Sequence, residues 1–128
     1  MKFIVSTTTL LKSVQTVCNA FDSHSIPILR NLLFEVKEGE IRVLCVNRKT
    51  YMSTELKVET TACGCFAISP RILLDTLKCL PERQLTFKIN KETFRVEIIS
   101  EASCERLRGK NAKKLKKAIS KRHPNALK

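Results

Sequence analysis

The residues best able to do chemistry are cations gathered at one end of the chain. From Arg106 to Lys128 there are ten Lys and Arg and no Asp or Glu, whereas residues 1–105 hold fourteen basic and twelve acidic side chains. The last 23 residues therefore carry +10 of the formal net charge of +12. Because clustered like charges repel one another but attract a polyanion, this segment predicts binding to nucleic acid or another anionic surface. The basic residues that we consider as ligands are Arg106, Arg108, Lys110, Lys113, Lys114, Lys116, Lys117, Lys121 and Arg122.

The basic segment has a weak helical pattern. Ala112, Leu115, Ala118 and Ile119 would share one side of a helix, with lysines around the rest. Such a basic amphipathic helix suits nucleic acid, an acidic partner or a membrane surface. The apolar stripe is narrow, so a disordered, solvated tail is the alternative. We expect a domain over residues 1–108 and a basic tail over 109–128 that is disordered or partly helical.

Cysteine and histidine chemistry is poorly supported. Cys63 and Cys65 could form half of a metal site, but no second Cys/His pair lies at zinc-ligand spacing. Most of the six cysteines have apolar neighbours, where a free thiol acts as a small hydrophobic group. We therefore expect no metal and no disulfide framework.

Catalysis is the least favoured function. No nucleophile and base stand in a plausible arrangement, and the three glycines form no phosphate-cradling loop. Asp75 and Glu82 look like surface charges of a helix. We expect a protein that is not an enzyme and has no cofactor.

Length and hydropathy indicate a single small domain. The chain has 128 residues and no apolar run near the ~20 residues needed to cross a bilayer. Its apolar start ends at Val5, which is too short for a signal peptide. We expect a cytoplasmic protein without membrane contact.

Two amphipathic helices are expected to position the polar groups. The first begins after possible caps at Ser6–Thr9 and the second after Ser69-Pro70, where Ser is expected to cap and Pro suits the first helical position. Their predicted apolar stripes consist of Leu10, Leu11, Val14, Val17, Cys18 and Phe21, and of Ile72, Leu73, Thr76, Leu77 and Leu80.

Strands are predicted wherever apolar and polar residues alternate. The predicted strands span residues 2–5, 32–37, 41–47, 52–58, 65–68, 84–89, 93–99 and 104–108. Each helix opens a similar half of the chain, which indicates an internal pseudo-repeat. The predicted class is α+β, with two helices packed on antiparallel sheet whose other face is solvated.

Four segments carry a resemblance to a known family. Residues 1–12, 26–36, 52–58 and 68–82 resemble the first domain of the bacterial DNA polymerase III beta subunit, the replicative sliding clamp. The resemblance extends to about Ala112, in register except for a small gap near Asp22–Ser25. It implies a DNA-clamp domain, one of three in a ring subunit that encircles duplex DNA as a processivity factor for the polymerase.

The resemblance also implies which residues face DNA. In such rings the helices line the hole, and weak contacts to phosphate carry no base information. The residues expected to face DNA are Lys12, Gln15, Asn19, His24, Arg30, Arg71 and Lys78.

The chain departs from the family after Ala112. Lys113–Lys117 stands where the family has an aromatic residue and proline, and Val46–Thr50 replaces an acidic stretch. The implied partners are duplex DNA, other clamp domains or subunits and, only with the missing domains supplied, DNA polymerase III. Two alternatives stay open: an interaction module that pairs with a full-length clamp, and a small nucleic-acid-binding protein acting through its tail.

Overall fold

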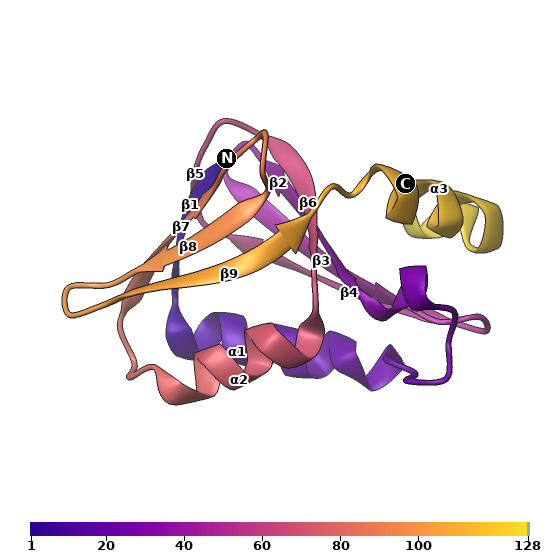
Figure 1. The fold of residues 1–128 in the computed structure, drawn as a ribbon, viewed down its shortest axis with the longest axis horizontal. Helices are drawn as coiled ribbons and strands as arrows, with labels where there is room; N and C mark the ends of the chain where they lie inside the picture. The colour runs from indigo at the N-terminus through magenta and orange to yellow at the C-terminus, as the bar shows by residue number, and fades with distance from the viewer. Residues whose placement is uncertain (128) are drawn as a thin grey trace.

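Alternating apolar residues build an antiparallel sheet in the computed structural model, which describes residues 1–127 (Figure 1). Over that range the strand order is β4-β3-β2-β6-β9-β8-β7-β1-β5. The strands are β1 (Lys2–Ser6), β2 (Leu32–Lys37), β3 (Glu40–Val46), β4 (Tyr51–Lys57), β5 (Glu59–Thr61), β6 (Gly64–Ile68), β7 (Gln84–Ile89), β8 (Arg95–Ile99) and β9 (Cys104–Lys110). The α+β prediction is confirmed, and every predicted strand is present to within two residues at each end.

Two helices cover one side of this sheet. They are α1 (Thr7–Val17), continued by the 3-10 turn η1 (Cys18–Ala20), and α2 (Pro70–Cys79). In Figure 1 they run side by side along the bottom of the view. The Ser6 side chain accepts a hydrogen bond from the backbone N of Thr9, which confirms the predicted cap. Ser69 is the N-cap residue of α2 and Pro70 its first residue, as predicted, but the Ser69 side chain makes no capping hydrogen bond.

The main core lies between the two helices and the inner face of the sheet. Val14 and Leu77 are fully buried there, together with Leu10, Leu73 and stacked Phe3 and Phe87. The predicted stripes were too wide, because Phe21 and Ile72 are 37% and 44% exposed. Both lie at the edge of the stripe, so they stay in solvent when its centre packs.

The two halves of the chain repeat each other and exchange strands. The buried positions Thr7, Leu10 and Val14 of α1 recur 63 positions later as Pro70, Leu73 and Leu77 of α2. The leading strand of the first half, β1, pairs with β7 of the second, and the leading strand of the second half, β6, pairs with β2 of the first. This confirms the predicted pseudo-repeat and shows that its halves interlock.

The outer face of β2, β3 and β6 is covered, contrary to our expectation of a solvated face. A third helix, α3 (Lys113–Arg122), lies there, followed by η3 (Pro124–Leu127). Leu115 and Ile119 pack on Leu33, Leu44 and neighbouring apolar residues in a second buried cluster. The signal that we overlooked is Leu32-Leu33-Phe34 and Val43-Leu44-Cys45-Val46, which are apolar on both faces rather than alternating.

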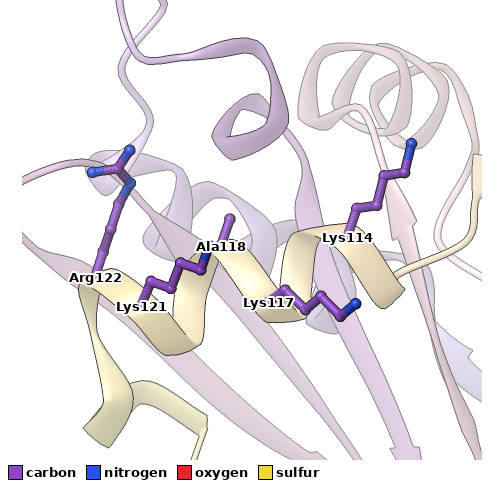
Figure 2. Close-up of a pocket in the computed structure, with 5 residues that line it drawn as sticks. All are labelled: Lys114, Lys117, Ala118, Lys121 and Arg122. Atoms are coloured by element: carbon purple, nitrogen blue, oxygen red, sulfur yellow. The ribbon is translucent and has the colours of Figure 1, made fainter.

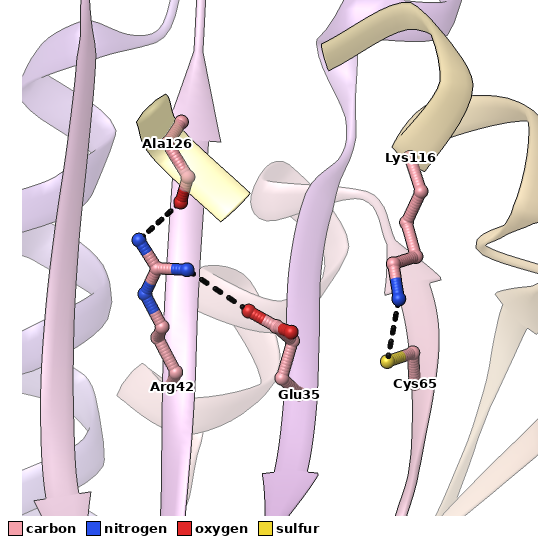
Figure 3. Close-up of polar contacts among 5 residues, drawn as sticks. All are labelled: Glu35, Arg42, Cys65, Lys116 and Ala126. Carbon is pink, nitrogen blue, oxygen red and sulfur yellow. Dashed lines mark hydrogen bonds and ion pairs between the residues drawn. The ribbon is translucent and has the colours of Figure 1, made fainter. Parts of the chain in front are cut away.

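Polar contacts also hold the C-terminal segment to the sheet (Figure 3). The buried Arg42 of β3 forms an ion pair with Glu35 at 3.1 Å and donates to the carbonyl of Ala126 in η3. The ring of His123 lies 2.7 Å from the carbonyl of Asn47. Within the expected tail over 109–128, residues 113–122 form a helix. The expected domain boundary at 108/109 falls inside strand β9, which continues to Lys110. Lys128 lies outside the described residues.

Candidate nucleic-acid interface

The outward faces of α1 and α2 form the first candidate surface. Because Leu10, Val14 and Val17 point into the core, Lys12 and Gln15 of α1 and Asn19 of η1 are exposed. Arg71 and Lys78 are exposed on α2 in the same way. The two helices lie side by side, so the fold brings these five polar side chains to one face of the molecule.

Contacts at the start of α1 fix its position relative to the end of α2. The Thr7 hydroxyl donates to the carbonyl of Pro81 at 2.8 Å, and the backbone N of Thr8 donates to the Glu82 carboxylate at 3.2 Å. A carboxylate is favourable at a helix N-terminus because it opposes the positive end of the dipole. Glu82, which is exposed as expected but lies beyond the end of α2, therefore links the start of α1 to the segment that follows α2.

His24 and Arg30 lie in the connection between α1 and β2. His24 is exposed, and its backbone N donates to the Asp22 carboxylate at 2.8 Å. Arg30 ends the 3-10 turn η2 (Pro27–Arg30), and its Nε donates to the carbonyl of Ser25 at 2.9 Å. One donor of Arg30 is thus used within the loop, and its exposed side chain keeps the other guanidinium donors for an anion.

The electrostatics of the helix face are weakly positive. Its charged groups on α1 and α2 are Lys12, Arg71, Lys78 and the carboxylate Asp75. A shallow hollow where α1 meets α2 is lined by Cys18, Phe21, Pro70, Arg71, Leu74, Asp75 and Lys78. So few cations can attract a phosphate backbone without holding it in one place.

Two thiols beneath this face, Cys18 and Cys45, have raised pKa values. Burial, with a smaller effect from Cys18, raises the pKa of Cys45 to about 12, and burial raises the pKa of Cys18 as well. A thiol with a raised pKa carries less of the nucleophilic thiolate. Within residues 1–127, no three His, Cys, Asp or Glu side chains gather as metal ligands, and no helix has the length and hydropathy of a membrane span.

The second candidate surface is the basic C-terminal segment, which the fold divides in two. Arg106, Arg108 and Lys110 alternate along β9, all exposed, with Arg95 of β8 opposite Arg108. Arg106 has an ion-pair partner, Glu97, at 3.5 Å. On α3 the exposed cations are Lys113, Lys114, Lys117, Lys121 and Arg122.

Lys116 differs from the other lysines of α3. Its Nζ lies 3.7 Å from the Sγ of Cys65, on the buried side of the helix (Figure 3). The aliphatic stem of a lysine can cover apolar surface in this way. The helical pattern alone could not show this, because the position of the helix depends on β6, which is distant in sequence.

The two candidate surfaces point in different directions. Along β2, Phe34 belongs to the main core under α1 and α2, whereas its neighbour Leu33 belongs to the cluster under α3. Successive side chains of a strand point to opposite faces. The helix face and α3 therefore lie on opposite sides of the sheet, as Figure 1 also shows.

Comparison with known proteins gives a consistent family. Residues 1–124 match the sequence model of a family described as DNA polymerase III beta subunit, N-terminal domain. A curated beta sliding clamp from Rickettsia felis is 28% identical over 87 residues, which are 67% of this chain and 23% of that relative.

Solved structures have the same fold. A putative DNA polymerase III beta subunit from Eubacterium rectale superposes with a TM-score of 0.83 at 23% identity, over 89% of this chain and 31% of that one. The sliding clamp of Bacillus subtilis gives a TM-score of 0.82 at 20% identity, over 88% of this chain and 32% of that one. The matched part of the chain thus covers 23% to 32% of the length of these relatives.

Proposed function

Since this chain belongs to the family of the DNA polymerase III beta subunit N-terminal domain, we propose that it serves as one domain of a replication clamp. In that role α1 and α2 face duplex DNA and contact its phosphates weakly, without reading bases. The domain acts as a processivity component and performs no catalysis. Its partners are duplex DNA, further clamp domains or subunits, and DNA polymerase III once those domains are supplied.

The observation that carries this proposal is the shared outward face of α1 and α2. Lys12, Arg71 and Lys78 provide mobile cations, and Gln15 and Asn19 provide neutral hydrogen-bonding groups. Phosphate contacts position DNA but carry no sequence information. Asp75 in the same face reduces the net attraction, which suits a surface along which DNA slides.

The test is the salt dependence of duplex binding by the full chain. Each phosphate contact contributes about −0.9 to the slope of log affinity against log salt, so the triple variant K12Q/R71Q/K78Q should lose roughly 2.7 of the slope. The control K57Q/K88Q/K91Q removes the same charge from exposed sites elsewhere. Equal slopes for the two triple variants would contradict a DNA-facing role for α1 and α2.

A second candidate function is pairing with another clamp subunit through β9. Cys104–Arg108 pairs with β8 on one side, whereas β6 pairs only with Gly109 and Lys110 on the other. A strand edge of this kind can accept a strand from another chain. Sedimentation of the chain mixed with the Rickettsia felis clamp should reveal a mixed complex, and unchanged sedimentation of both proteins would exclude this pairing.

A further inference from the structure

The exposed side of α3 carries positive charge with no acidic partner. Lys113, Lys114, Lys117, Lys121 and Arg122 are exposed, and no ion pair among residues 1–127 involves α3. A shallow hollow along the helix is lined by Lys114, Lys117, Ala118, Lys121 and Arg122 (Figure 2). In Figure 2 the side chains of Lys114 and Arg122 extend away from the helix, and those of Lys117 and Lys121 lie along it.

Several of these charges work against the helix that carries them, although Lys121 and Arg122 lie in its last turn, where the dipole favours cations. Lys113 and Lys114 occupy the first turn, where the helix dipole favours anions, and no acidic residue lies there. Lys113, Lys117 and Lys121 follow one another at four-residue spacing, which places like charges side by side. Asn111 accepts a hydrogen bond from the backbone N of Lys113 at 2.9 Å but adds no negative charge.

Apolar packing of α3 and the polar contacts of Arg42 and His123 beyond its C-terminal end, not pairing of the surface charges, therefore keep α3 in place. Leu115 and Ile119 are each 1% exposed against the outer face of β2, β3 and β6. The result is a row of unpaired cations fixed on a rigid support. A ligand with regularly spaced negative charges would remove the repulsion between them.

We propose that α3 is a second nucleic-acid-binding surface, which contacts the phosphodiester backbone and goes beyond the proposed role of α1 and α2. Lys114, Lys117 and Lys121 recur at three- and four-residue spacing, so they follow one line along the helix at a rise of about 4.5 to 6 Å. Successive phosphates of one DNA strand are about 3.4 Å apart along the axis. The two spacings are not equal, but each lysine has a flexible four-carbon stem, so each ammonium group can reach a separate phosphate of one strand.

The buried apolar side of α3 argues for nucleic acid rather than a membrane. A helix that binds a bilayer surface inserts its apolar face into the lipid. Here Leu115 and Ile119 are occupied by the sheet, and Ala118 is the apolar residue among those lining the hollow. The side chains that α3 exposes to solvent are mainly cationic, and cationic side chains bind phosphate groups.

The position of α3 sets what it can bind together with α1 and α2. The two surfaces lie on opposite sides of the sheet, so one straight duplex cannot lie against both. Nucleic acid bound by α3 is therefore a different segment from any duplex at the helix face.

The experiment compares two triple variants of the full chain by fluorescence anisotropy with a labelled duplex between about 50 and 200 mM salt. We expect K114Q/K117Q/K121Q to reduce the slope of log affinity against log salt by roughly 2.7, since three phosphate contacts are lost. K57Q/K88Q/K91Q, with the same loss of charge, should keep the slope. Circular dichroism confirms that both variants are folded, which Gln favours because it is a good helix former.

A second measurement reports the local stability of α3 itself. Hydrogen exchange of the amides in Lys113–Arg122 should slow on addition of duplex DNA, because bound phosphate removes the repulsion. Single-stranded DNA should give a shallower salt slope, about −0.7 per contact. Equal slopes for the two variants, unchanged exchange in α3, or binding to phosphatidylserine vesicles in preference to DNA would each overturn the proposal. The variant K12Q/R71Q/K78Q tests α1 and α2 independently.

Discussion

A hydrogen bond between Arg42 and Ala126 connects β3 of the sheet to the last turn of the described chain. The Arg42 guanidinium, on the outer face of β3, donates to the Ala126 carbonyl while its other Nη donates to Glu35. One side chain thus neutralises a half-buried carboxylate and holds η3 against the sheet. The C-terminal segment depends on this contact as well as on the apolar residues of α3.

Replacing Arg42 should therefore be costly. In Arg42→Met the Glu35 carboxylate, 13% exposed, loses its partner, and we expect a loss of about 3 kcal/mol in the free energy of unfolding. Urea denaturation measures this loss. The double variant E35Q/R42M should recover part of it, because no unpaired charge remains. An unchanged urea midpoint for R42M would show that the pair does not stabilise the fold.

The two helix starts should respond differently to loss of serine. Ser6→Ala removes a side-chain acceptor for the backbone N of Thr9 and should cost about 1 kcal/mol in thermal or urea unfolding. Ser69→Ala removes no capping bond and should leave the stability almost unchanged. Equal losses in the two variants would contradict this assignment of the caps.

Gly109 marks the place where β9 passes from β8 to β6. A Cβ at this position would collide with the backbone oxygen of Phe94, whose φ is 60°. Gly109→Ala should therefore cost about 1–3 kcal/mol, as overpacking does. Gly64→Ala is the control, since its Cβ meets only the flexible side chain of Met1. The thermal midpoint of G109A should lie clearly below that of G64A.

The buried thiol of Cys45 should make stability fall at high pH. Its pKa is about 12 in the folded chain against an ordinary value of 9.0, so between these values the folded state keeps a proton that the unfolded chain loses. The free energy of unfolding then decreases as pH rises above about 9. Urea midpoints measured from neutral pH to pH 10 should fall more steeply for the natural chain than for Cys45→Ala. Parallel curves would contradict the raised pKa.

Local pattern was enough to predict most elements of this fold. The predicted bounds of β2 and β7 match the structure, and Val14 and Leu77 were placed correctly in the core. β5 was missed because Glu59–Thr61 is short and polar and exists through pairing with β1, nearly sixty residues away. Such long-range pairing leaves no local signal in the sequence.

The candidate surfaces were harder to predict than the elements. Sequence identified the lysines of α3, but it could not show that Lys116 contacts Cys65 or that Leu115 rests on Leu33 and Leu44. Those contacts depend on the position of α3 on the sheet, which is set by the end of β9 directly before it. Glu82 is exposed, as predicted, but it lies beyond the end of α2 instead of on a helix, and its carboxylate accepts a hydrogen bond from the first turn of α1.

The exchange of leading strands makes each half of this chain a structural requirement of the other. Without β6, β2 would lose one of its two neighbours, and without β1, β7 would lose one of its own. A cut between the halves should therefore abolish folding of both pieces rather than release two small stable units. A duplication that keeps the fold must therefore copy both halves together. An insertion is tolerated only where the pairing of β1 with β7 and of β6 with β2 keeps its register.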